Sequence, residues 1–175
     1  MRPLERSDNL ILGQYFLNLS EHTRSLYGPH PFDQATADQF CENINYADTI
    51  RMIATVSEGA GEQVIAYFIL QLGIPKDETQ RYVKAGILLE PHLDCLIAPC
   101  VADAYQNHGL GTPLMRQVFE VACSLGRRYI VLMGGVYVTN DRAVHYYQKL
   151  GFKNIGSFEP SWPNGRTSYD MYLEL

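Results

Sequence analysis

The sequence predicts a single domain of the mixed α/β (α+β) class over residues 1–175. Three patterns indicate this class: apolar residues at helical spacing in the first third, β-branched and apolar runs in the middle, and helices that alternate with strands from there onward. A chain of 175 residues is long enough for one domain with a sizeable core. Since no repeat or low-complexity linker divides the sequence, we expect one domain throughout.

Two helices are expected before the first strand. Ser7 or Asp8 can cap the first helix, and Asp33 precedes the second, with Gly28-Pro29 between them. The residues expected to face the core recur at i, i+3, i+4 and i+7: Leu12, Tyr15, Phe16 and Leu19, then Ala37, Phe40, Cys41 and Ile44.

Two strands follow, and we expect them to form a hairpin. Residues 51–56 are β-branched, residues 59–62 have the composition of a turn, and residues 64–72 form a long apolar run. The segment 74–90 begins polar and ends apolar, and its pattern predicts no element.

Helices and strands alternate in the second half of the chain. The expected elements are strands at 93–102, 128–133, 152–158 and 169–175 and helices at 112–125 and 140–150. Pro99 interrupts the first of these strands, and because proline cannot donate to a ladder it predicts an edge, a bulge or a break. Gly126 and Gly151 are expected to end the helices. The helix at 112–125 should bury Leu114, Val118, Val121, Ala122 and Leu125.

The last two strands have their own signals. Pro163-Asn164-Gly165 predicts a turn between them, and Trp162 just before it could contact a substrate or anchor the core. The final strand alternates, with Tyr169, Met171, Leu173 and Leu175 on one face and Ser168, Asp170, Tyr172 and Glu174 on the other.

Composition disfavours several classes of protein. The net charge is −5 and no lysine- or arginine-rich run is present, so nucleic acid is not the expected partner. The apolar run at 64–70 is too short to span a bilayer, and the first residues do not resemble a signal peptide; we therefore expect a cytoplasmic protein without a membrane partner. The cysteines form no Cys-x-x-Cys pair, and the spacing of His92, Asp94 and Cys95 fits no common zinc site, so no metal is expected.

The segment 101–112 predicts an anion-binding loop. A strand leads into Val101, Ala102, Asp103, Ala104, Tyr105, Gln106, Asn107, His108, Gly109, Leu110, Gly111 and Thr112, and a helix begins there. Free N–H groups and the positive end of the helix dipole would then face the loop, where the two glycines permit close approach of a pyrophosphate. The P-loop lysine and the third Rossmann glycine are both missing, which favours coenzyme A over ATP or a dinucleotide. A plain tight turn into a helix is the alternative.

Two segments resemble the GNAT superfamily of N-acetyltransferases. Residues 106–111 match its Gln/Arg-x-x-Gly-x-Gly/Ala loop, and residues 140–152 resemble its Asn-x-x-Ala-x-x-x-Tyr-x-x-x-Gly-Phe segment. The resemblance implies a mostly antiparallel central sheet with flanking helices and a splayed strand pair that admits the pantetheine arm. Pro99 lies about where that splay should begin, and the long connection at 74–90 departs from the family pattern.

The resemblance also implies roles for single residues. Gln106 to Thr112 would hold the pyrophosphate of acetyl-CoA, a backbone N–H near Val101 and Ala102 would polarise the thioester carbonyl, and Asn140 and Ala143 would line the coenzyme arm. Tyr147 occupies the position that often protonates the departing thiolate, with simple packing against the coenzyme as the alternative. Tyr146 is interpreted as packing and His108 as facing solvent.

The general base is less clearly indicated. Asp94 lies roughly where relatives carry a glutamate, Glu90 is a second option, and water a third. Cys100 lies near the expected thioester, but an acyl-cysteine route would need a neighbouring base, and none is evident.

The predicted function is transfer of the acetyl group of acetyl-CoA to a primary amine of a small molecule or protein, without a metal, by a monomer or homodimer. A non-catalytic acyl-CoA-binding regulatory module and a pure interaction protein are the alternatives.

Overall fold

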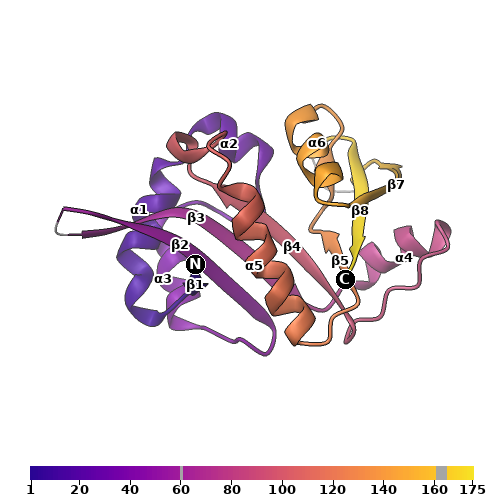
Figure 1. The fold of residues 1–175 in the computed structure, drawn as a ribbon, viewed down its shortest axis with the longest axis horizontal. Helices are drawn as coiled ribbons and strands as arrows, with labels where there is room; N and C mark the ends of the chain where they lie inside the picture. Colours follow the sequence, from indigo (N-terminus) through magenta and orange to yellow (C-terminus); the bar gives the residue numbers. More distant parts are fainter. Residues whose placement is uncertain (60, 161–164) are drawn as a thin grey trace. The chain divides into compact units, whose positions relative to one another are not determined.

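The computed structural model describes residues 1–59, 61–160 and 165–175 (Figure 1). These residues form two compact units, each assembled from two stretches of chain: unit 1 from Met1–Leu70 and Ala98–Val118, and unit 2 from Gln71–Ile97 and Phe119–Leu175. Strands β3 (Gly61–Leu72) and β4 (Asp94–Val101) and helix α5 (Gly111–Ser124) contribute residues to both. This division does not test the single-domain prediction, which stays a prediction.

The strands follow the order β1-β2-β3-β4-β5-β8-β6, and β7 also pairs with β8. Their bounds are Arg2–Pro3 for β1, Thr49–Glu58 for β2, Tyr129–Leu132 for β5, Val136–Tyr137 for β6, Lys153–Phe158 for β7 and Ser168–Glu174 for β8. Strands β4 and β5 are parallel, whereas β1 with β2, and β8 with β5, β6 and β7, are antiparallel. The predicted mixed fold with a mostly antiparallel sheet and flanking helices is therefore confirmed.

Helices α1 (Asn9–Asn18), α2 (Glu21–Leu26) and α3 (Gln34–Glu42) belong to unit 1. Helix α3 begins directly after Asp33, as predicted, and the Asp33 carboxylate caps it by accepting the Thr36 N–H at 2.8 Å. Asp8 occupies the cap position of α1, but its side chain does not cap the helix. It accepts the Glu5 N–H and pairs with Arg2 instead, so the prediction that Asp8 could cap this helix was wrong. A short 3₁₀ turn, η1 (Arg6–Asp8), forms there.

The two longer helices of unit 1 pack tightly against each other and lie side by side in Figure 1. At Gly13 the approach is so close that a Cβ atom would overlap the Gln34 side chain. The predicted stripe of α1 is buried in full: Leu12, Tyr15, Phe16 and Leu19. Its helical spacing was therefore a sound guide to the core of this unit.

Unit 2 contains helices α4 (Lys76–Lys84) and α6 (Asp141–Lys149). Helix α4 lies in the segment for which no element was predicted. It contributes Tyr82 to a core with Ile74, Leu89, Leu96 and Val131, and the Tyr82 hydroxyl donates to the Met171 carbonyl at 3.0 Å. This helix therefore anchors to β8 through one buried aromatic residue.

Three other expectations need correction. Leu125 is 44% exposed because α5 ends at Ser124, so it does not belong to the core. Strand β6 is too short to leave a periodic signal and was not predicted. Strand β8 buries Ser168 and Asp170 as well as Met171, because it pairs with three other strands, and its alternation does not separate core from solvent.

Some expectations fall outside the described residues. Trp162, with Pro163 and Asn164 of the predicted turn, is among them. Within the part that is described, no helix has the length and apolar character needed to cross a membrane.

Candidate active site

In unit 1, the loop that leads from β4 into α5 contains two residues with left-handed backbone conformations. A 3₁₀ turn, η2 (Asp103–Tyr105), is followed by Asn107 at φ 64° and Gly109 at φ 77°. Helix α5 then begins at Gly111, where the first N–H groups of a helix have no partner inside it. A Cβ atom built on Gly109 would meet nothing within 4 Å, so the chain leaves the space beside this residue open. The loop therefore has the open backbone and the helix terminus that an anionic pyrophosphate requires.

Two side chains fix this loop from within unit 1. Gln106 Nε2 donates to the Val101 carbonyl at 2.9 Å and to Thr23 Oγ1 at 3.3 Å. Asp103 accepts from the backbone N–H and hydroxyl of Ser20 and from the Thr23 hydroxyl, at 2.6–2.9 Å. Although burial opposes it, these hydrogen bonds lower the pKa of Asp103 below its ordinary value. The Gln106 side chain thus braces the loop, and sequence reasoning missed the contribution of α2.

The end of β4 offers little free backbone. The Ala102 N–H donates to the Ile65 carbonyl at 2.8 Å, so it is already engaged, and the Tyr15 hydroxyl donates to the Cys100 carbonyl at 2.9 Å. Burial raises the pKa of the Cys100 thiol to about 12. Because the thiolate is the nucleophilic form, this environment disfavours the acyl-cysteine route.

The parallel ladder between β4 and β5 is short. It pairs Asp94 with Tyr129 at one end and Ile97 with Leu132 at the other, and the Met133 N–H donates to the Ile97 carbonyl at 2.9 Å. The pairing of β4 with β5 ends there, two residues before Pro99, although β4 itself continues to Val101. Pro99 therefore lies inside β4 but beyond the segment that pairs with β5, in agreement with its lack of a backbone N–H.

Helix α6 of unit 2 carries the second motif. Asn140 caps it, because its Oδ1 atom accepts the Ala143 N–H at 3.2 Å. Tyr147 is 9% exposed, and its ring lies 5.4 Å from that of Tyr146 and 5.3 Å from that of Phe152. Burial raises the pKa of Tyr146 above its ordinary value, in keeping with its interpretation as a packing residue. Ala143 and Tyr147 share one face of the helix, being four residues apart.

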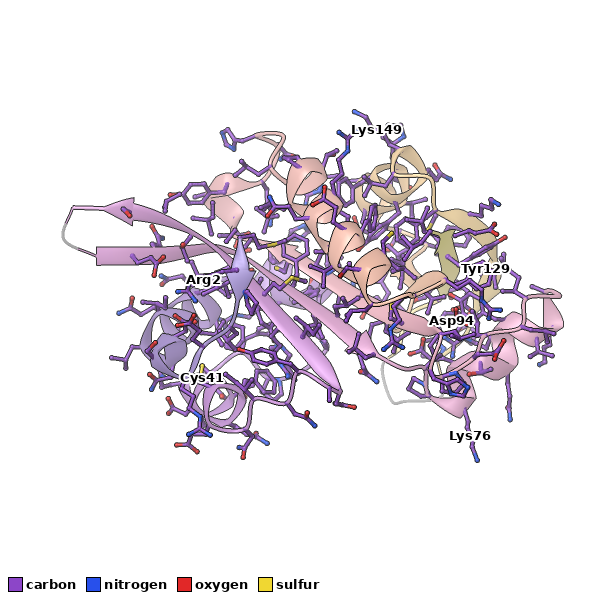
Figure 2. The ribbon with its side chains drawn as sticks, turned by 60° about the horizontal axis from the view of Figure 1, so that its bottom comes forward. Arg2, Cys41, Lys76, Asp94, Tyr129 and Lys149 are labelled. Atoms are coloured by element: carbon purple, nitrogen blue, oxygen red, sulfur yellow. The ribbon has the colours of Figure 1, made fainter. Side chains whose placement is uncertain are left out.

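Asp94 lies at the opening of β4 and is fully buried. Its carboxylate accepts from Arg128 Nη2 at 2.9 Å, from the Tyr129 N–H at 3.0 Å and from the Glu90 N–H at 2.6 Å. Figure 2 shows Asp94 beside Tyr129 at this end of the ladder. Glu90 is exposed and pairs with Arg128 at 3.2 Å. Both predicted base candidates thus take part in an ion-pair cluster that holds the start of the ladder together.

A third carboxylate, which sequence reasoning did not consider, lies in unit 2. Glu78 is 9% exposed, and its Oε1 atom accepts the Gly134 N–H at a long 3.4 Å. Its Oε2 atom is buried without a hydrogen-bond partner and lies 3.7 Å from Arg81 Nη2. Burial raises the pKa of Glu78 to about 7, and the charge of Arg81 opposes that rise. No spacing pattern in the sequence points to this residue, because α4 has almost no apolar stripe.

Metal-ligating side chains do not gather in the described parts of the chain. No group of three or more His, Cys, Asp or Glu residues there is placed to hold an ion. Asp94 is committed to the cluster around Arg128, and the buried Cys95 thiol has its pKa raised to about 12 by burial.

Comparison with known proteins identifies the family. The model of the acetyltransferase (GNAT) family matches residues 21–152, which include both the loop and helix α6. The chain belongs to the GNAT acetyltransferase family. This assignment confirms the resemblance inferred from residues 106–111 and 140–152.

Solved structures share the fold of this GNAT protein. The GNAT domain of PAT from S. lividans is 19% identical with a TM-score of 0.73, covering 99% of this chain and 89% of that one. A GNAT-family acetyltransferase from Streptococcus pneumoniae is 18% identical with a TM-score of 0.72, covering 99% and 97%. Spermidine N-acetyltransferase from Vibrio cholerae, solved with CoA and spermine, is 23% identical with a TM-score of 0.69, covering 99% and 93%.

Proposed function

We propose that this GNAT protein transfers the acetyl group of acetyl-CoA directly to a primary amine of a small molecule or a protein. The observation that carries the proposal is the braced loop at 106–111, which opens into the N-terminus of α5 with an open backbone at Gly109. A pyrophosphate is the ligand that such a terminus suits best, because free N–H groups and the helix dipole both favour negative charge.

The coenzyme residues divide into two groups by task. Asn107, His108, Gly109, Leu110, Gly111 and Thr112 supply backbone N–H groups, and in Thr112 a hydroxyl, to the pyrophosphate, whereas Gln106 holds the loop in shape. The Val101 N–H polarises the thioester carbonyl; Ala102 is less suited to this task, since its N–H already bonds Ile65. Asn140 and Ala143 at the start of α6 line the coenzyme arm.

Tyr147 is proposed as the acid for the leaving group. A phenol, with an ordinary pKa of about 10, can protonate a thiolate whose conjugate acid has a pKa of about 8.5 when the two are in contact. The burial of Tyr147 supports this role, because a group held among aromatic rings keeps one orientation. Asp94 is not retained as the base: it lies at the opposite end of β4 from Val101, and Arg128 and two backbone N–H groups already occupy its carboxylate.

The acceptor is proposed at the level of a primary amine. Relatives of this fold include a spermidine N-acetyltransferase, so polyamines belong in the first set of compounds to be tested. At low identity that likeness carries the fold and not the substrate.

Two measurements test the proposal. Isothermal titration with acetyl-CoA should give micromolar binding, and a thiol-release screen over amines, with spermidine, amino acids and lysine peptides included, should identify an acceptor. Binding without any turnover would favour a non-catalytic acyl-CoA sensor. Absence of binding by the folded protein would overturn the loop assignment.

A further inference from the structure

Glu78 combines deep burial with an unused acceptor atom. The residue is 9% exposed, and its Oε2 atom has no hydrogen-bond partner. A buried carboxylate oxygen without a partner is costly, and such atoms are rare in folded proteins. An additional N–H donor would complete this site, and a protonated amine provides one.

The neighbouring cation does not supply that donor. Arg81 directs Nε and Nη2 to the Asp170 carboxylate at 2.8 and 3.0 Å, and its guanidinium lies 3.9 Å above the Phe158 ring. This bidentate pairing holds the guanidinium in one orientation, so Glu78 Oε2 receives only an ion pair at 3.7 Å. Two buried carboxylates thus share one cation, and the group as a whole favours a second positive charge.

The position of Glu78 on the sheet separates it from Asp94. Gly134, whose N–H reaches Glu78, follows the Ile97–Leu132 pair that ends the parallel ladder, whereas Asp94 and Tyr129 form the pair that begins it. The ladder end at Gly134 is the one from which β4 runs on toward Val101, the residue proposed to polarise the thioester. Glu78 therefore lies at the opposite end of the β4–β5 ladder from Asp94.

We propose that Glu78 is the proton acceptor for the attacking amine and that it selects cationic primary amines. This inference rests on the proposed acetyltransferase function. The ammonium group donates to Oε2 and transfers one proton to it, which leaves a neutral amine. The amine nitrogen then attacks the thioester carbonyl carbon, and the C–S bond breaks as the C–N bond is completed. Tyr147 protonates the sulfur and regains a proton from the new amide nitrogen, and Glu78 releases its proton to water.

The protonation equilibrium of Glu78 suits this task. Burial raises its pKa to about 7, Arg81 and the Gly134 N–H oppose the rise, and Asp170 and Asp77 add to it. Tyr82, on the same helix as Arg81 and Asp77, also lies within electrostatic reach of Glu78. A base with a pKa near the working pH can both take and release a proton within each cycle.

Glu78→Gln tests the inference, with Asp77→Asn on the same helix as the matched control. The probe is spermidine, or, if spermidine is not acetylated, the primary amine with the highest turnover in the screen. We expect Glu78→Gln to lower kcat/KM for the amine by about 10²-fold or more and to leave acetyl-CoA affinity within a few-fold. The wild-type kcat/KM should rise with pH through about 7, and this limb should be absent in Glu78→Gln and retained in Asp77→Asn.

A second measurement separates catalysis from folding. Because the folded state raises the pKa of Glu78, its burial favours the folded state at low pH, and this contribution is lost as pH rises through about 7. Glu78→Gln should therefore melt several degrees higher than wild type at pH 8 and show a smaller difference at pH 5. An unchanged kcat/KM and pH profile in the folded variant would overturn the base assignment while acetyl transfer stands. If wild type binds acetyl-CoA but acetylates no amine, the proposed function itself fails, and this inference fails with it.

Discussion

The sequence assigned its proposed chemistry most directly to single residues on α6 and in the loop at 106–111. Tyr147 is buried among aromatic rings and Tyr146 is its neighbour, so the two phenols form a natural pair for comparison. They are adjacent on a helix and hence point about 100° apart. Only one of them can share the face of Ala143.

Tyr147→Phe should lower kcat by about 10²-fold or more while acetyl-CoA affinity stays within a few-fold, because the lost hydroxyl acts on the departing thiolate and not on the bound ground state. Steady-state kinetics and titration with acetyl-CoA provide the check. Tyr146→Phe is the matched control and should change kcat much less. Near-normal turnover of Tyr147→Phe, with chemistry rate-limiting, would leave this residue a packing element only.

Gly109→Val should weaken acetyl-CoA binding by about 2 kcal/mol or more, comparable to the loss of hydrogen bonds to a charged group. Gly126→Val is the control, since Gly126 at the other end of α5 has a similar φ of 67° and equally open surroundings. Both variants therefore carry the same left-handed strain, and calorimetric titration should detect a binding loss in Gly109→Val alone. If both variants bound acetyl-CoA with equal affinity, the assignment of the pyrophosphate to this loop would be wrong.

At the scale of elements, periodicity predicted those helices that bury an apolar stripe and failed where burial is achieved otherwise. Helix α4 has a core contact through Tyr82, and its other buried residue is the charged Glu78. Such a helix has no stripe to recognise, and β6, with two residues, has no period at all. The loop and α6 were found because their motifs depend on local backbone geometry, whereas the bracing of Gln106 by α2 depends on residues more than eighty positions away.

Tyr82→Phe should lower the free energy of unfolding by about 1–3 kcal/mol. The buried Met171 carbonyl loses its donor, and α4 loses the hydrogen bond that connects it to β8. Urea denaturation gives the value. Tyr46→Phe is the comparison: that hydroxyl also donates to a carbonyl, that of Leu4, but the residue is 46% exposed and water can replace it. The anchoring role of α4 would be refuted by equal losses in both variants.

At the scale of the whole molecule, every step of the proposed reaction is assigned to groups of the protein itself. In this proposal the loop holds the coenzyme, a backbone N–H polarises the carbonyl, and Tyr147 and Glu78 move the protons. The sequence shows no convincing set of metal ligands beside these groups. Acceptor identity, by contrast, was beyond sequence reasoning, since Glu78, the residue proposed to bind the amine, lies on a helix that the sequence did not predict.

Treatment of the purified protein with EDTA should therefore leave the turnover of acetyl-CoA unchanged within error, measured by thiol release before and after dialysis. Addition of zinc or magnesium should not raise it. A loss of turnover on chelation that either ion restores would contradict the expectation that the reaction needs no metal. His92, Asp94 and Cys95 would then be the first candidate ligands to test.

The pairing of β8 has a consequence for the order in which the chain acquires structure during its synthesis. All residues of unit 1 have been made once Val118 is complete, so this unit can assemble while the ribosome is still at work. Unit 2 must wait for β8, because β5, β6 and β7 all pair with Ser168–Glu174, which is translated after them. Until then the edges of β5 and β7 that later receive β8 are open to other strands. Unit 2 is thus most vulnerable to aggregation, and most in need of a chaperone, in the interval before β8 emerges from the ribosome.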